Sequence, residues 1–171
     1  MKTIASFTVN HDTLTEGMYV SRIDGDVVTY DIRMKLPNGG DYLDMRAGHT
    51  LEHLFATYAR NSELGDKVIY VGPMGCCTGF YFLTRDTMTS EEAIALVRES
   101  MAFARDFEGE IPGNKKEECG NYLDHDLSGA KAIGADGVVG SITEGKTADF
   151  VVCDANYNKL QVYIAGEGVF A

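Results

Sequence analysis

Apolar and polar side chains alternate along residues 18 to 36, MYVSRIDGDVVTYDIRMKL, which is the two-residue period of β-strands. Asp24-Gly25 interrupts this stretch near its middle, where the turn of a β-hairpin is expected. The segment Pro37-Asn38-Gly39-Gly40 then ends the alternation. The first part of the chain is therefore predicted to be an antiparallel hairpin.

Helical and strand patterns follow one another in the next part of the chain. Residues 49 to 60, HTLEHLFATYAR, have apolar side chains at helical spacing: Leu51, Leu54, Phe55 and Tyr58. KVIYVGPMG and TGFYFLTRD are predicted to be two strands around a glycine-rich bend. Thr89-Ser90-Glu91-Glu92 is a capping box that starts a second helix, whose apolar stripe is Ile94, Val97, Met101 and Ala104. The predicted fold class is α+β, an antiparallel sheet with helices packed on it.

Composition excludes several classes of function. The chain has 171 residues, enough for one domain or for one domain with an appendage. Its net charge is −11 and it has no basic cluster, so neither a nucleic-acid partner nor an anionic membrane surface is expected. No apolar run approaches the roughly 20 residues of a membrane span, and the N-terminus becomes polar too early for a signal peptide. We therefore expect a cytoplasmic protein.

The sharpest local motif is His49-Thr50-Leu51-Glu52-His53. On a helix, His49 and His53 project from one face, so both imidazoles can reach one metal ion. Glu52 lies beside that face and is placed to act as a base without binding the metal. This H-x-x-E-H pattern is the inverted zinc-hydrolase motif. The alternative is a pair of solvent-facing histidines on an amphipathic helix.

The cysteines are the second group of candidates. Their spacing gives no disulfide framework, so metal-binding or catalytic thiols are favoured: Cys76, Cys77, Cys119 and Cys153. Cys119 can complete a His-His-Cys site with an open fourth position, although taken alone it is better interpreted as a small buried apolar residue. Cys76 lies between glycines on tight backbone that a substrate can approach, but nothing local separates it from Cys77.

Three further residues have ordinary interpretations when each is taken alone. A single histidine such as His11 is more often structural than catalytic. Arg33 would be a surface charge on a strand, and His125, between two aspartates, would belong to a solvated loop. The residues by themselves indicate a metalloenzyme with an accessory cysteine.

Taken together, these stretches resemble the S-ribosylhomocysteine lyase family, the autoinducer-2 production proteins. The matching segments occur in family order: Ser6-Phe7 through His11, Asp31-Ile32-Arg33, His49 through Leu54, Pro73 through Cys76, Thr78 through Tyr81, Cys119-Gly120, and Asp126-Leu127 through Lys131. They cover about residues 1–133, which we expect to form the lyase domain, with residues 134–171 as an atypical C-terminal β extension.

The resemblance implies a role for each matching residue. His49, His53 and Cys119 would bind one divalent metal ion per subunit, natively Fe²⁺, with Zn²⁺ possible. Glu52 and Cys76 would be the acid–base pair. The substrate contacts would come from three residues: Ser6, His11 and Arg33. The family works as a homodimer with active sites at the interface.

The implied reaction moves the carbonyl of open-chain S-ribosylhomocysteine from C1 to C3 and then expels homocysteine. The metal would polarise the carbonyl, and Cys76 would move protons between neighbouring carbons. Glu52 would protonate and deprotonate the substrate oxygens. The products would be homocysteine and 4,5-dihydroxy-2,3-pentanedione, with no organic cofactor.

The sequence departs from the family at three places. Cys77 stands where Arg or Gln is common, and Tyr70-Val71-Gly72 replaces Asp-Ile-Ser in many relatives. In the tail, Gly134, Asp136 and Gly137 would break the family's helix. Residues 140 to 152 instead resemble the C-terminal end of N-acetylglucosamine-6-phosphate deacetylase-type amidohydrolases. A β-hairpin-like tail with a turn at Asn156-Tyr157-Asn158 is expected, without a useful helix between residues 134 and 145.

Two other functions compete with the lyase. A metallopeptidase of the H-x-x-E-H class would use Glu52 to activate a metal-bound water, but it would leave Cys76 and Cys119 without a role. A structural zinc site with four protein ligands would make the chain an interaction module without catalysis.

Overall fold

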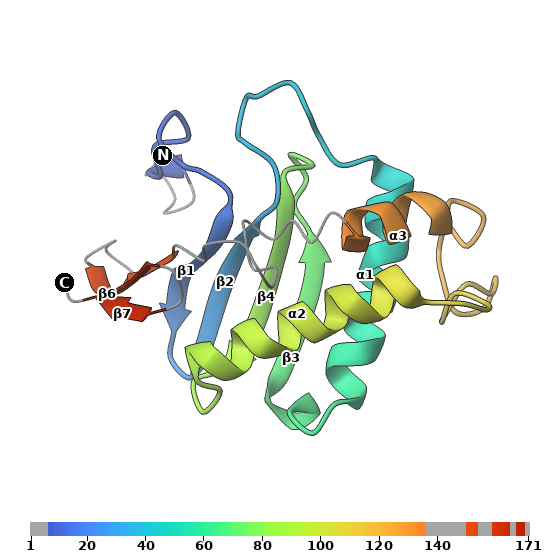
Figure 1. Cartoon of the computed structure of the whole chain (residues 1–171). Coiled ribbons are helices and arrows are strands. Elements are labelled where there is room, and N and C mark those ends of the chain that lie inside the picture. Colours follow the sequence, from blue (N-terminus) through green and yellow to red (C-terminus); the bar gives the residue numbers. More distant parts are fainter. Residues whose placement is uncertain (1–6, 136–149, 154–158, 165–166, 170–171) are drawn as a thin grey trace.

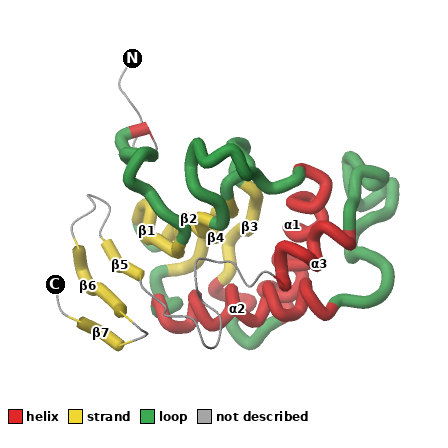
Figure 2. The backbone as a smooth tube through the Cα atoms, turned by 45° about the horizontal axis from the view of Figure 1, so that its top comes forward, coloured by secondary structure: helices red, strands yellow, loops and turns green. Residues whose placement is uncertain are grey.

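A computed structural model describes residues 7–135, 150–153, 159–164 and 167–169 of the chain. Four strands form one antiparallel sheet, and three helices pack together beside it as a second layer (Figure 1). Figure 2 shows the strands on one side and the helices on the other. The expected α+β fold, an antiparallel sheet with packed helices, is confirmed.

The sheet has the strand order β1-β2-β4-β3: β1 (Gly17–Asp24), β2 (Val27–Arg33), β3 (Val68–Pro73) and β4 (Gly79–Arg85). Asp24 pairs with Val27, so the hairpin loop is Gly25-Asp26, one residue later than predicted. Gly25 has a φ of +61°, a left-handed conformation that glycine adopts at little cost. The predicted strands on both sides of the glycine-rich bend are β3 and β4, which pair from Val68 with Thr84 to Pro73 with Phe80.

The two predicted helices are present, and a third follows them: α1 (Met45–Asn61), α2 (Ser90–Asp106) and α3 (Leu127–Ala135). The α1 helix begins four residues before His49, because the Asp44 side chain accepts hydrogen bonds from the first turn of backbone N–H groups. The capping box at the start of α2 is confirmed, with Thr89 and Glu92 as the reciprocal pair. The apolar patterns did not predict α3.

The core lies between the sheet and the helices. Its largest fully buried apolar side chains come from α1, α2 and the central strands: Phe55, Phe80, Phe82, Ile32, Leu51, Leu54, Leu96 and Val97. Three of the four apolar residues predicted to face the core from α1 are among them. The fourth, Tyr58, lies at the edge of the core, and its hydroxyl donates a hydrogen bond to Glu99. In the predicted α2 stripe Val97, Met101 and Ala104 are buried, and Ile94 is partly buried.

The tail contains a separate three-stranded antiparallel sheet of β5 (Phe150–Cys153), β6 (Lys159–Ile164) and β7 (Glu167–Val169). The antiparallel pair β5–β6 agrees with the expected β-hairpin-like tail, and β7 is an additional strand. The expected turn at residues 156–158 and the stretch from 136 to 145 lie outside the described residues. Among the helices of the described residues, none combines the length and apolar character needed to cross a bilayer.

Candidate metal centre

One face of α1 carries the two histidines of the H-x-x-E-H motif. Their ring centroids are 4.8 Å apart, and the rings stand at 81° to each other. The Asp44 cap fixes where the helix starts and places both residues well inside it. The predicted spacing of His49 and His53 on one helical face is therefore present.

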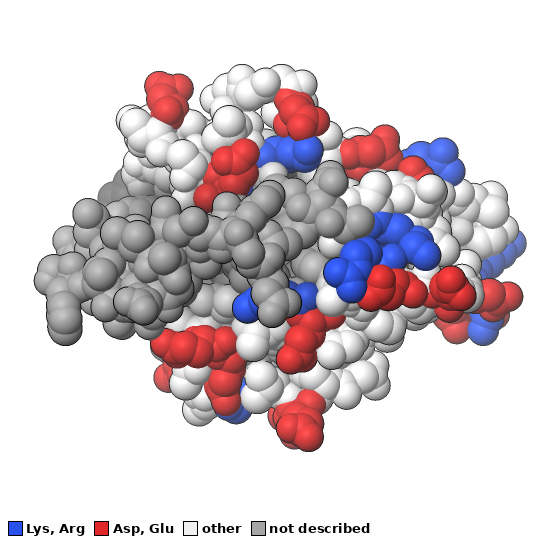
Figure 3. Space-filling view, viewed as in Figure 1, with Lys and Arg blue, Asp and Glu red and all other residues white. Residues whose placement is uncertain are grey.

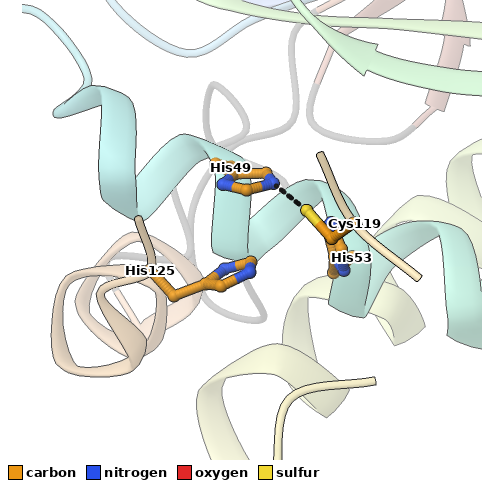
Figure 4. A group of neighbouring side chains, drawn as sticks. All are labelled: His49, His53, Cys119 and His125. Carbon is orange, nitrogen blue, oxygen red and sulfur yellow. Dashed lines mark hydrogen bonds between the residues drawn. The ribbon is translucent and has the colours of Figure 1, made fainter. Parts of the chain in front are cut away.

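The loop between α2 and α3 brings two more potential ligands to this face. The Cys119 thiol lies 3.5 Å from Nε2 of His49, and His125 comes from the end of the same loop (Figure 4). The ligand atoms of all four side chains lie within 4.8 Å of one another. Imidazole nitrogens and a thiol sulfur at this spacing are a donor set suited to a divalent transition metal.

Backbone carbonyls fix the orientation of both motif histidines. Nδ1 of His49 is 2.9 Å from the carbonyl oxygen of Asp124, and Nδ1 of His53 is 2.7 Å from that of Pro112. A carbonyl oxygen only accepts, so each Nδ1 carries the proton and each Nε2 keeps its lone pair. This is the outer-shell arrangement that usually orients metal-binding imidazoles.

Gly113 lets the loop backbone approach the metal centre. Its φ is +71°, and a Cβ atom at this position would lie 3.2 Å from Nδ1 of His53. A side chain here would therefore be strained and would also crowd the ring that the Pro112 carbonyl holds.

His125 is the site residue that sequence reasoning missed. It was expected in a solvated loop, but it is only partly exposed and its ring stacks on His49, with centroids 4.2 Å apart. Burial lowers the pKa of His125, and the nearby His49 and His53 lower it further. Its position six residues after Cys119 was the only available signal, because the contacts that place it join distant parts of the chain.

Glu52 lies beside the histidines on the wall of an open pocket of about 340 Å³. The other walls come from α1, β3 and the α2–α3 loop: His53, Ala56, Thr57, Arg60, Tyr70, Val71, Pro112 and Gly113. Burial raises the pKa of Glu52, while the two neighbouring histidines oppose the rise. A carboxyl group with a raised pKa holds a proton more readily than an ordinary one, which suits it to acid–base work beside a metal site.

A second group of polar residues surrounds Cys76. The guanidinium of Arg33 donates to Thr78 Oγ1 at 2.5 Å and lies 3.8 Å from the Cys76 thiol, which is 3.0 Å from the same hydroxyl. Arg33 also makes a two-pronged ion pair with Asp31. Only 3% of Arg33 is exposed, so its interpretation as a surface charge was wrong.

The structure separates the two adjacent cysteines. Cys76 is exposed and contacts the Arg33–Thr78 pair. Cys77 has a φ of +56°, is partly buried and packs against the apolar core. The turn that contains Cys76 and Cys77 therefore directs the two side chains into different surroundings, a difference that the sequence alone did not reveal.

The remaining predicted substrate contacts lie toward the N-terminus. His11 donates through Nδ1 to the carbonyl oxygen of Val9. Ser6 lies outside the described residues.

The buried Arg33–Asp31 pair gives a prediction about stability. Replacing Arg33 by methionine leaves the Asp31 carboxylate without its cation in a largely buried position, where burial already raises its pKa. We expect the free energy of unfolding to fall by about 3–5 kcal/mol, the usual cost of breaking a buried pair on one side. Urea unfolding measures the change.

Two matched variants check this prediction. Arg22→Met removes the cation of an exposed pair with Asp24 and should cost less than about 1 kcal/mol. Arg33→Met combined with Asp31→Asn removes both charges and should be less damaging than Arg33→Met alone. Equal losses at Arg22 and Arg33 would contradict a special role for burial.

The fold and these side chains define a class of protein, an α+β enzyme with a cluster of three histidines and one cysteine that could hold a metal ion, and with an adjacent carboxyl group. The sequence profile of the S-ribosylhomocysteinase (LuxS) family matches residues 4–147. The chain belongs to this family.

Several relatives are similar over most of the chain. The S-ribosylhomocysteine lyase of Phocaeicola vulgatus is 52% identical over 136 residues, which cover 77% of this chain and 84% of the relative. The lyase of Clostridium acetobutylicum is 51% identical over 132 residues, covering 74% and 84%. That of Porphyromonas gingivalis is 49% identical over 136 residues, covering 77% and 86%. These matches give no support to the resemblance between the tail and amidohydrolases.

Proposed function

We propose that this protein is an S-ribosylhomocysteine lyase, which cleaves S-ribosylhomocysteine to homocysteine and 4,5-dihydroxy-2,3-pentanedione. The observation that carries the proposal is the cluster of His49, His53 and Cys119, assembled in a chain that matches lyases at about 50% identity. The reaction is a carbon–sulfur bond cleavage after two carbonyl shifts.

His49, His53 and Cys119 would hold the metal ion, because their lone pairs converge and the carbonyls of Asp124 and Pro112 fix the two rings. The ion would be ferrous iron natively, with zinc as an alternative. When bound, it would polarise the carbonyl oxygen of the substrate and stabilise negative charge there.

Cys76 and Glu52 would carry the protons. Cys76, exposed beside the Arg33 guanidinium, would remove a proton from one substrate carbon and return it to the next. Glu52, on the wall of the pocket, would protonate and deprotonate the oxygens of the substrate. Removal of the last carbon-bound proton would place electrons beside the C–S bond, which then breaks and releases homocysteine thiolate. Ser6, His11 and Arg33 would hold the sugar.

We propose a homodimer with active sites at its interface. The ligand residues and Glu52 come from α1 and the α2–α3 loop, whereas Cys76 and Arg33 lie in the β3–β4 loop and at the end of β2. Each group has its own hydrogen-bond network, which is consistent with a site assembled from two subunits. Sedimentation equilibrium of the full chain gives the oligomeric state.

Two further proposals concern the chain as a whole. Residues 1–133 would be the lyase domain and residues 134–171 an extension, although α3 continues through this boundary to Ala135. A cytoplasmic location would fit a substrate that is an intracellular thioether. The resemblance of the tail to amidohydrolases stays a prediction from sequence.

The direct test is incubation of the purified protein with S-ribosylhomocysteine and a thiol assay for released homocysteine. Protein stripped of metal by a chelator is the control, and activity should return with Fe²⁺ or Zn²⁺. Peptide hydrolysis without homocysteine release would instead support the metallopeptidase.

A substitution at Glu52 tests its proposed role. Glu52→Gln keeps the size and polarity but cannot exchange a proton, so turnover should fall by roughly 10²-fold or more. Metal content should stay unchanged, because the residue is assigned outside the ligand set. Steady-state rates and metal analysis of the same sample give both values.

Glu63→Gln is the matched control, since Glu63 is exposed just beyond the end of α1. It should leave both values at the wild-type level. A wild-type rate in Glu52→Gln would remove Glu52 from the reaction.

A further inference from the structure

The inference concerns His125, the histidine that the proposed reaction does not use. Its Nε2 atom is buried and has no hydrogen-bond partner among the described residues. His125 belongs to a cluster with His49, His53 and Cys119 whose potential ligand atoms lie within 4.8 Å of one another. A buried nitrogen without a partner costs free energy, so it normally has a ligand that completes it.

The protonation of the ring follows from its neighbour Thr50. The Thr50 hydroxyl donates its single proton to the carbonyl oxygen of Arg46, at 2.9 Å. The hydroxyl oxygen itself, Thr50 Oγ1, accepts from the backbone N–H of Asp126, also at 2.9 Å. Nδ1 of His125 lies 3.1 Å from that oxygen and must therefore donate to it. A neutral His125 then has a free lone pair on Nε2, which can accept a proton or bind a metal.

Ring geometry separates these two possibilities. An imidazole binds a metal in the plane of its own ring. The rings of His49 and His125 lie one above the other (Figure 4). Their centroids are 4.2 Å apart and their planes are only 20° from parallel. His53 stands at 81° to both rings. The in-plane lone pair of His125 therefore lies in a plane nearly parallel to that of His49 but displaced from it, so the two stacked rings are poorly arranged to hold one ion together.

We propose that His125 is a substrate-contacting residue rather than a fourth metal ligand. Its Nε2 accepts a hydrogen bond from the hydroxyl or water oxygen that occupies the open coordination position next to His49, His53 and Cys119. The chemical class that it recognises is an O–H or N–H group adjacent to a metal-binding oxygen, as in an α-hydroxycarbonyl compound. The identity of the substrate in this proposal rests on the proposed function, whereas the argument from the geometry of His125 does not.

The experiment uses the full chain loaded with Co²⁺, with His125 replaced by phenylalanine. Phenylalanine keeps a flat ring for stacking on His49 and removes the acceptor. We expect the Co²⁺ dissociation constant and the visible spectrum of the His-His-Cys site to be unchanged. Affinity for acetohydroxamate, which carries an N–H beside its metal-binding oxygen, should fall roughly 10-fold, the scale of one hydrogen bond.

Two variants control for folding and chemistry. His125→Gln keeps an acceptor and should recover part of the acetohydroxamate affinity. Leu123→Ala alters an exposed residue of the same loop and should change nothing. Turnover of S-ribosylhomocysteine should follow the same order, with the largest loss in His125→Phe.

The outcomes are distinct. Weaker Co²⁺ binding with altered absorption bands in His125→Phe would make His125 a metal ligand and overturn the proposal. Unchanged affinity for acetohydroxamate would overturn it as well. If the wild-type protein released no homocysteine, the proposed function would fail, while the acetohydroxamate comparison would still decide the role of His125.

Discussion

Replacing Cys76 by alanine is expected to lower turnover of S-ribosylhomocysteine by roughly 10²- to 10⁴-fold, the range for a positioned acid–base group. The thiol is exposed and contacts Arg33 and Thr78, and no other thiol shares these contacts in the described part of the chain. Metal content should remain at the wild-type level, because the substitution leaves His49 and Cys119 in place. Single-turnover assays and metal analysis on one preparation separate the two effects.

The adjacent thiol provides the matched control. Cys77→Ala should keep a rate within a few-fold of wild type, because Cys77 turns toward the apolar core. Its left-handed backbone is equally unfavourable for alanine and cysteine, so the turn should persist. Activity lost in Cys77→Ala and kept in Cys76→Ala would show that the roles of the two cysteines had been assigned in reverse.

Replacing Cys119 by alanine is expected to remove metal and activity together. Its thiol lies 3.5 Å from the His49 nitrogen, and the remaining two imidazoles would offer a neutral, incomplete donor set. The loss of metal affinity should exceed the roughly 10- to 100-fold that follows removal of an outer-shell partner. Competition with a chromogenic chelator measures the affinity.

Glu117→Gln is the control for this loop, since Glu117 is exposed two residues before the thiol. It should bind metal like the wild type. Stoichiometric, tightly bound metal in Cys119→Ala would exclude Cys119 from the ligand set and would point to His125 as its replacement.

Local patterns were sufficient for most elements of the fold. Alternation found β1 and β2, helical spacing found α1, and the capping box found α2, because each signal depends on neighbours in the chain. The errors were also local. The hairpin turn lies one residue later than predicted, and α1 starts four residues before the predicted helix because Asp44 caps it.

The errors at the site had a different origin. His125 is placed by a hydrogen bond with Thr50, 75 residues earlier, and Arg33 is buried by contacts with Thr78, 45 residues later. Neither contact leaves a periodic trace in the sequence. The ordered family motifs identified Cys76 without explaining why it differs from Cys77, which became clear only from the turn that contains them.

The α2–α3 loop has a consequence for how the protein persists in a cell. Cys119 and His49 are 70 positions apart, so the donor set exists only after the chain has folded. An ion that binds only the folded chain acts as a reversible cross-link. At a free ion concentration 100 times the dissociation constant, it adds about 2.7 kcal/mol to the free energy of unfolding. Scarcity of metal would then increase the unfolded fraction available to proteases by about 100-fold at most under these conditions, so enzyme abundance would track metal supply as well as gene expression.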